Sequence, residues 1–111
     1  MIRSNRIRRQ AVRARRAQSR AQARIRRGPA TLATHAIAAG LGVKAARTVA
    51  ASLRKAAAKL GVVGVTGVAY RKGRARACVR YTRQQVAVIV TVYRPRKPAY
   101  VLAASKLALA A

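Results

Sequence analysis

The sequence contains no aspartate and no glutamate among its 111 residues. A chain without side-chain carboxylates cannot build paired-carboxylate acid/base sites, magnesium or calcium cages, or Ser-His-Asp triads. Cys78 and His35 are the only cysteine and histidine, whereas a zinc site needs about four ligands. We therefore expect no metal, no cofactor and no small-molecule substrate, and we predict that the protein is not an enzyme.

Long apolar runs are also missing. The β-branched stretch VAVIVTVY, residues 86–93, is far shorter than the roughly 20 residues of a membrane-spanning helix. A single cysteine excludes a disulfide within the chain and fits a reducing compartment. We expect no membrane partner and a cytoplasmic location, associated with a nucleoid or a particle. An organelle matrix stays open, because the Arg-rich, acid-free N-terminus also resembles a transit peptide.

Positive charge is what the chain has in abundance. It carries 26 Lys and Arg, a formal net charge of +26, and no side-chain anion offsets their mutual repulsion. The compensating negative charge must come from a partner. Nucleic acid is the densest polyanion in a cell, and a protein that neutralises its phosphates gains free energy from the counterions that are released. The composition therefore predicts a nucleic-acid-binding protein.

Arginines dominate residues 1–28, which we interpret as a nucleic-acid-binding arm. On a helix, arginines spaced three or four residues apart form one stripe suited to tracking phosphates; they are Arg6, Arg9, Arg13, Arg16, Arg20, Arg24 and Arg27. A second stripe, from Ile7 to Ile25, is small and weakly apolar. Because like charges at these spacings repel, we expect the arm to become helical when phosphates screen it. Gly28 and Pro29 end this unit.

The second unit, residues 29–111, begins with an alanine-rich segment that predicts two helices. Thr31 or Thr34 can cap the first, and glycines end it. The second helix runs over about 44–60, with Gly61 as its stop. Its apolar stripe consists of Val49, Leu53, Ala56 or Ala57, and Leu60.

This segment resembles the helix-turn-helix of DNA-binding regulators. The positions that carry the likeness are Ile37, Ala38, Leu41, Gly42 and Val43. The resemblance implies that the second helix enters the major groove, with Lys44, Arg47 and Thr48 near the bases. The family pattern has an apolar residue where Thr48 stands, and Val49 follows one place later, so the register of this helix stays open. The other predicted contacts on the helix are Arg54 and Lys55.

Two alternating runs, residues 65–70 and 75–81, flank a short turn and predict a β-hairpin. After a helix-turn-helix, such a hairpin resembles the wing of a winged helix, whose tip lies against the DNA backbone or in the minor groove. The resemblance gives phosphate-contacting roles to Arg71, Lys72, Arg74 and Arg76. One face of the hairpin should be basic and solvated, and the other should pack. Tyr70 and Tyr81 are expected to cover the core and its edge, with stacking on unpaired bases as the alternative.

Residues 82–93 carry conflicting signals. Alternating valines predict a third strand, whereas Thr82 and Gln85 form a capping box that predicts a helix. We favour the helix, because the box stands where the apolar run begins. A proline-punctuated basic loop at 94–98 and a final helix over 99–111 follow. A third strand would instead make the domain resemble an AP2-type DNA-binding domain or a double-stranded RNA-binding domain.

These features predict an α+β fold in which a helical N-terminal half, a β-hairpin and a C-terminal helix form a small winged-helix-like domain behind the Arg-rich arm. We expect a non-enzymatic protein that binds nucleic acid, DNA in preference to RNA, in a regulatory, condensing or mobile-element accessory role. An RNA-binding structural component of a ribosome, ribonucleoprotein or virion is the alternative.

Overall fold

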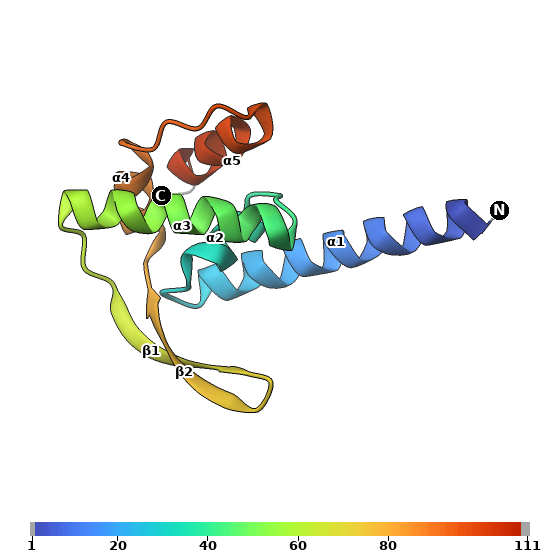
Figure 1. Ribbon diagram of the computed structural model, residues 1–111, viewed down its shortest axis with the longest axis horizontal. Helices are drawn as coiled ribbons and strands as arrows, with labels where there is room; N and C mark the ends of the chain where they lie inside the picture. Colours follow the sequence, from blue (N-terminus) through green and yellow to red (C-terminus); the bar gives the residue numbers. More distant parts are fainter. Residues whose placement is uncertain (1, 110–111) are drawn as a thin grey trace.

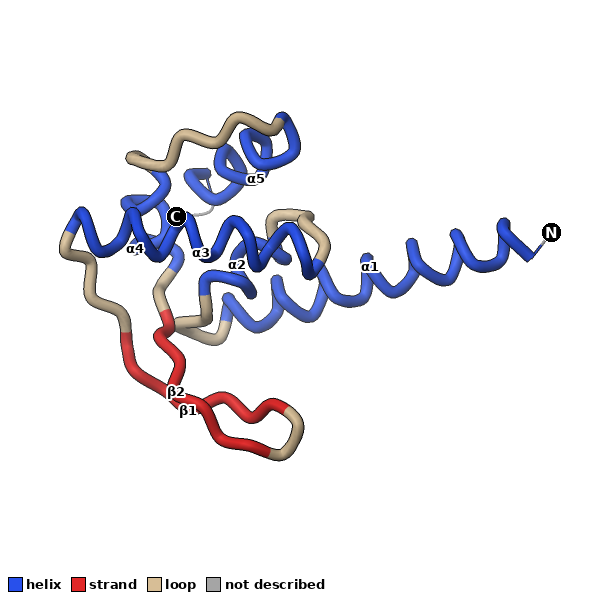
Figure 2. The backbone as a smooth tube through the Cα atoms, viewed as in Figure 1, coloured by secondary structure: helices blue, strands red, loops and turns tan. Residues whose placement is uncertain are grey.

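The structure, a computed structural model, describes residues 2–109, without the side chains of residues 2, 3 and 71. Its elements are α1 (Ile2–Arg26), α2 (Leu32–Ala38), α3 (Val43–Leu60), β1 (Val65–Arg71), β2 (Arg74–Arg80), α4 (Arg83–Val90) and α5 (Pro98–Leu109). α1 projects from a body of shorter helices (Figure 1), and the hairpin of β1 and β2 hangs from that body (Figure 2). The order of elements confirms the predicted α+β fold class.

α1 is one continuous helix whose last turns pack against α2. Ala21 is buried, and the side-chain amides of Gln18 and Gln22 both donate hydrogen bonds of 3.3 Å to the carbonyl oxygen of Ala38. Packing against the body therefore stabilises the helical form of α1, in addition to any screening of its charges by phosphates. This contact joins residues 1–28 to residues 29–111, the two units that the sequence predicted. Only residues 4–16, here called the projecting segment, have uniformly exposed side chains.

Local signals in the sequence account for the ends of α2 and α3. The hydroxyl oxygen of Thr31 accepts a hydrogen bond of 3.3 Å from the backbone N–H of Thr34, which identifies Thr31 as the cap of α2. α3 ends at Leu60 because Gly61 adopts a φ of 69°, a left-handed conformation that favours glycine. Both outcomes agree with the predicted helix limits.

The core lies among α2, α3, α4 and α5. Its largest fully buried side chains are Leu53, Ile89, His35, Val49 and Val86. Most of the remaining core positions are alanines, and such small side chains let helix axes approach closely. Val49 is buried and Thr48 is exposed, so the buried position of α3 stands one place later than in the helix-turn-helix pattern. Leu60, the predicted end of the apolar stripe, is 40% exposed.

β1 and β2 pair antiparallel, with Val65 opposite Arg80 at one end and Arg71 opposite Arg74 at the other. The two residues between the strands, Lys72 and Gly73, have φ values of 52° and 74°. Positive φ at both central positions defines a type I′ turn, whose twist matches that of the flanking strands. The hairpin is therefore closed by a tight turn at the predicted place.

The two faces of the hairpin differ in chemistry. One carries Arg74, Arg76 and Arg80. The other carries Val68, Tyr70 and Val79, which are 53%, 79% and 45% exposed. The expectation that this second face packs is wrong towards the tip, because the hairpin leaves the helical body and no described element covers it (Figure 2). Tyr81, where β2 rejoins the body, is buried in the core as expected.

Residues 83–90 form α4, as the capping box predicts. The hydroxyl oxygen of Thr82 accepts from the backbone N–H of Gln85 at 3.1 Å, and the side-chain oxygen of Gln85 accepts from the N–H of Thr82 at 2.9 Å. The described part of the chain has no third strand, so the AP2-type and double-stranded RNA-binding alternatives do not apply. α5 begins at Pro98, a first-turn position where the missing N–H costs no helical hydrogen bond.

Candidate nucleic-acid interface

α3 presents a basic face to solvent along its whole length. The opposite side of α3 is buried in the core and consists of Val49, Leu53 and alanines. The exposed residues between positions 44 and 59, here called the α3 face, are Lys44, Arg47, Thr48, Ala51, Arg54, Lys55, Ala58 and Lys59. All the contacts predicted on this helix therefore lie on one surface, where cations are separated only by small side chains.

Thr48 makes a local contact that limits what its hydroxyl can do. The hydroxyl donates a hydrogen bond of 3.2 Å to the carbonyl oxygen of Lys44, one turn earlier in α3. Its lone pairs remain able to accept a hydrogen bond. Thr48 can thus meet a donor group of a ligand, whereas Lys44 and Arg47 supply donors.

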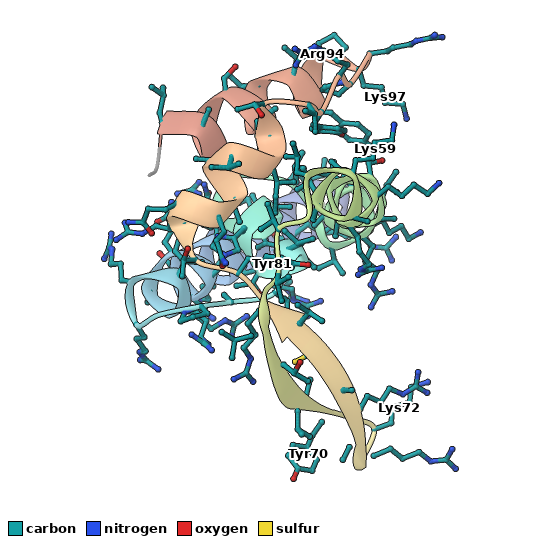
Figure 3. The ribbon with its side chains drawn as sticks, turned by 90° about the vertical axis from the view of Figure 1, so that its left-hand side faces the viewer. Lys59, Tyr70, Lys72, Tyr81, Arg94 and Lys97 are labelled. Atoms are coloured by element: carbon teal, nitrogen blue, oxygen red, sulfur yellow. The ribbon has the colours of Figure 1, made fainter. Side chains whose placement is uncertain are left out.

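The α3 face continues towards the hairpin through Arg54. This side chain lines a cleft of about 300 Å³ together with Thr66 and Ala77 of the hairpin. Figure 3 shows Lys72 at the hairpin tip pointing to the side on which α3 and Lys59 lie, whereas Tyr70 points to the opposite side. Lys72 of the turn and the α3 face therefore lie on the same side of the molecule. Thr66 and Ala77 belong to the strand face opposite Arg74 and Arg76.

The other predicted hairpin contacts lie on the strands next to the turn. Arg74 and Arg76 are exposed and share the basic face of β2. The backbone of Arg71 belongs to β1, but its side chain lies outside the described residues. Gly67 leaves room for the guanidinium of Arg80, which crosses the strand and donates to the carbonyl of Val68 at 3.2 Å.

The arginine stripe of α1 is exposed at most of its positions. Those exposed are Arg6, Arg9, Arg13, Arg16, Arg20 and Arg27. Arg24 is half-buried, and its charge acts on His35 in the body. In Figure 3, α1 and α3 lie on opposite sides of the hairpin base. The stripe and the α3 face are therefore separate cationic surfaces.

The sequence analysis missed a third cationic region. Arg26, Arg83 and Lys106 come from α1, α4 and α5 and line one cleft. No sequence pattern links these residues, because each lies on a different helix and only tertiary packing brings them together. Arg26 lies outside the stripe of arginines on α1, and this departure could have indicated that the arm has more than one basic side.

Other kinds of site are not visible in the structure. Across residues 2–109, no three His, Cys, Asp or Glu side chains form a group that could hold a metal ion. None of the helices in this part of the chain combines the length and the apolar character needed to cross a membrane. None of the protein-family models, curated proteins or solved structures compared with the chain matches it.

Proposed function

We propose that this protein is a non-enzymatic nucleic-acid-binding protein whose preferred partner is double-stranded DNA. The observation that carries the proposal is the α3 face, on which Lys44, Arg47 and Lys59 mark a basic surface from the first turn of the helix to the last. An 18-residue helix is about 27 Å long, and the major groove of B-form DNA admits a helix.

Charge supports this proposal independently of shape. The chain has 26 basic residues and no Asp or Glu, so no cation on the α3 face has a side-chain counterion. Bringing phosphates to this surface removes repulsion within the protein and releases condensed counterions from the nucleic acid. Both effects favour binding at low salt and weaken as the salt concentration rises.

The arrangement of α2, α3 and the hairpin supports DNA over RNA. A short helix, a turn at residues 39–42 and a longer exposed helix follow the helix-turn-helix order, and the hairpin tip points its Lys72 to the side of α3 (Figure 3). With α3 in the major groove, this tip would meet the flanking backbone. The deep, narrow major groove of A-form RNA does not admit side chains in the same way.

The test compares binding to a mixed-sequence DNA duplex and to a structured RNA at matched salt. Anisotropy of labelled nucleic acid should show tighter binding to the duplex. Arg47→Ala should weaken binding and, where one base is preferred, remove about 1–3 kcal/mol of discrimination at that base. Arg96→Ala, in the exposed loop between α4 and α5, removes the same charge from a residue outside the α3 face and is the matched control.

The outcomes separate the candidate roles. Equal losses for Arg47→Ala and Arg96→Ala would refute the α3 face as the binding surface. Tighter binding to structured RNA would assign the chain to the RNA-binding components of ribonucleoprotein particles or virions. Selection from random duplexes that yields no preferred sequence would support a condensing role and exclude site-specific regulation.

A further inference from the structure

A cleft of about 400 Å³ opens between α1, α2, α4 and α5. None of its lining residues belongs to α3 or to the hairpin, so it is distinct from the proposed nucleic-acid interface. Three cations surround it, and we call them the cleft cations: Arg26, Arg83 and Lys106. All three side chains are exposed to solvent.

The cleft cations repel one another across three helices. The chain has no Asp or Glu, so none of them pairs with a carboxylate side chain. An anion in the cleft would contact cations from α1, α4 and α5 together and would relieve this repulsion. It would also tie the end of α1 to α4 and α5.

Two side chains that line the cleft, Gln18 and Lys106, both extend to Gly40. A Cβ at Gly40 would lie 3.7 Å from the Nζ of Lys106 and 3.7 Å from the Nε2 of Gln18. The ammonium and the amide therefore lie close to the same point. Gln18 and Gln22 each give one amide proton to the carbonyl of Ala38, which leaves a second proton on each amide for another acceptor.

The remaining walls of the cleft are largely apolar. Ile25, Val86 and Leu107 line it, here called the cleft floor, and Val86 and Leu107 are almost fully buried. His35 also lines the cleft and is 1% exposed. A site with an apolar floor and a few convergent polar groups suits a small organic ligand.

We propose that this cleft binds a small organic phosphate, with the phosphate among the cleft cations and the organic part on the cleft floor. Arginine forks match phosphate oxygens in geometry, and lysine adds a point charge. A nucleotide has this chemistry, whether it is free in solution or forms the phosphorylated end of a nucleic-acid strand. The proposal does not depend on DNA binding by the α3 face.

His35 offers a direct reporter, because it is the only histidine of the chain and its ring protons give isolated NMR signals. Adenosine monophosphate is titrated at constant pH and ionic strength. The His35 signals should shift and saturate at one ligand per protein. In Arg83→Gln/Lys106→Gln the midpoint should rise at least about tenfold, because two charge-assisted hydrogen bonds are lost.

The matched variant is Arg47→Gln/Arg54→Gln, which removes the same charge from the α3 face and should leave the midpoint within about twofold of the parent. Equal weakening in both variants, or a shift that never saturates, would overturn the proposal and mean general screening of a basic surface. Adenosine binding as tightly as its monophosphate would overturn the role of the phosphate. Inorganic phosphate binding as tightly would overturn the role of the cleft floor.

Two further ligands distinguish the sources of the phosphate. A dinucleotide with a 5′-phosphate is compared with the same dinucleotide without it. If the phosphorylated form shifts the His35 signals as the monophosphate does and the other form does not, the cleft takes strand ends. If neither dinucleotide binds and the monophosphate does, the cleft takes free nucleotides. Binding of neither dinucleotide nor monophosphate would overturn the proposal.

Discussion

The Nε2 atom of His35 lies 2.7 Å from the carbonyl oxygen of Tyr81. Because a carbonyl oxygen only accepts, Nε2 carries the proton and donates it. Tyr81 also pairs with Ala30 through two backbone hydrogen bonds of 3.0 and 2.8 Å. His35 therefore holds together two segments, the end of β2 at Tyr81 and the residues that follow α1. This hydrogen bond explains why a histidine stands in an otherwise apolar core.

This contact predicts that the protein loses stability as the pH falls below about 6.5. Burial lowers the pKa of His35 from its ordinary 6.5, the carbonyls of Tyr81 and Ala30 oppose that shift, and the charges of Arg83 and Arg24 add to it. The unfolded chain thus binds a proton that the folded chain resists. The free energy of unfolding should fall as the pH drops from 6.5 towards the lowered pKa, by at most about 1.4 kcal/mol per pH unit.

Denaturant unfolding at several pH values measures this dependence. The chain has no Asp or Glu, so no other side chain titrates between about pH 4.5 and 6.5. In His35→Gln, the amide can still donate to the carbonyl of Tyr81, and the dependence should disappear. A variant that keeps the dependence would move the titrating group to the chain termini and contradict the assignment to His35.

Local and distant contacts explain how far the sequence could predict this fold. The reciprocal hydrogen bonds of Thr82 and Gln85 join residues three places apart, so the capping box was readable and decided between helix and strand. The bond from His35 to Tyr81 joins residues 46 places apart, and no local pattern indicates it. The limits of the helices and the α3 face depend on local patterns and could therefore be predicted from the sequence.

The features that the sequence predicted wrongly or did not predict also depend on contacts between distant parts of the chain. Alternation in the hairpin correctly separated Arg74 and Arg76 from Val68 and Tyr70, but it could not show whether another element covers the apolar face. The stripe of α1 was readable, whereas the packing of Ala21 on α2 depends on where the chain turns after the helix. The cleft cations required the full tertiary arrangement.

The packing of α1 predicts that its two parts respond differently to truncation. Deleting residues 1–16 removes the projecting segment and leaves Ala21 and Gln18 on the body, so the melting temperature should change little. Binding to duplex DNA should weaken with a smaller salt dependence, because the stripe loses Arg6, Arg9, Arg13 and Arg16. The slope of log affinity against log salt should decrease in magnitude by about 3–4.

Deletion of residues 1–28 is the matched comparison. It also removes Ala21, which is 6% exposed, and the amides that contact Ala38, so the melting temperature should fall. The circular dichroism of the parent protein should gain helical signal when duplex is added. This gain should come from the projecting segment alone, because the rest of α1 is already held by packing on the body. An unchanged salt slope after deleting residues 1–16 would show that this segment does not contact phosphates.

Gly64 is predicted to be indispensable for the approach of the two hairpin strands. A Cβ at this position would lie 2.6 Å from both the carbonyl oxygen of Arg80 and the Cγ1 of Val79. Gly64→Ala should therefore destabilise the protein by about 1–3 kcal/mol, as overpacking does. Gly42→Ala meets no atom within 4 Å at an ordinary φ of −68° and should cost less than about 1 kcal/mol. Equal unfolding midpoints for the two variants would contradict this view of Gly64.

Lys72 occupies a position in the hairpin turn that a lysine fills at a cost. Its φ of 52° is left-handed, and such a conformation costs a residue with a Cβ about 1 kcal/mol, whereas asparagine before glycine is preferred in a type I′ turn. Lys72→Asn should therefore slow amide hydrogen exchange in β1 and β2. The lysine is also exposed on the side of α3 (Figure 3), so the same variant should bind duplex DNA more weakly.

Substitution of Lys72 can test whether the hairpin contacts DNA, because the turn geometry favours asparagine whereas a phosphate contact requires the positive charge. Lys72→Asn should reduce the magnitude of the salt slope by about 0.9, the value for one phosphate contact. Lys72→Arg keeps both the charge and the left-handed cost, so it should leave the salt slope and the hydrogen exchange close to those of the parent. Slower exchange in Lys72→Asn with an unchanged salt slope would show that the turn is strained as the structure indicates but that its lysine does not contact DNA.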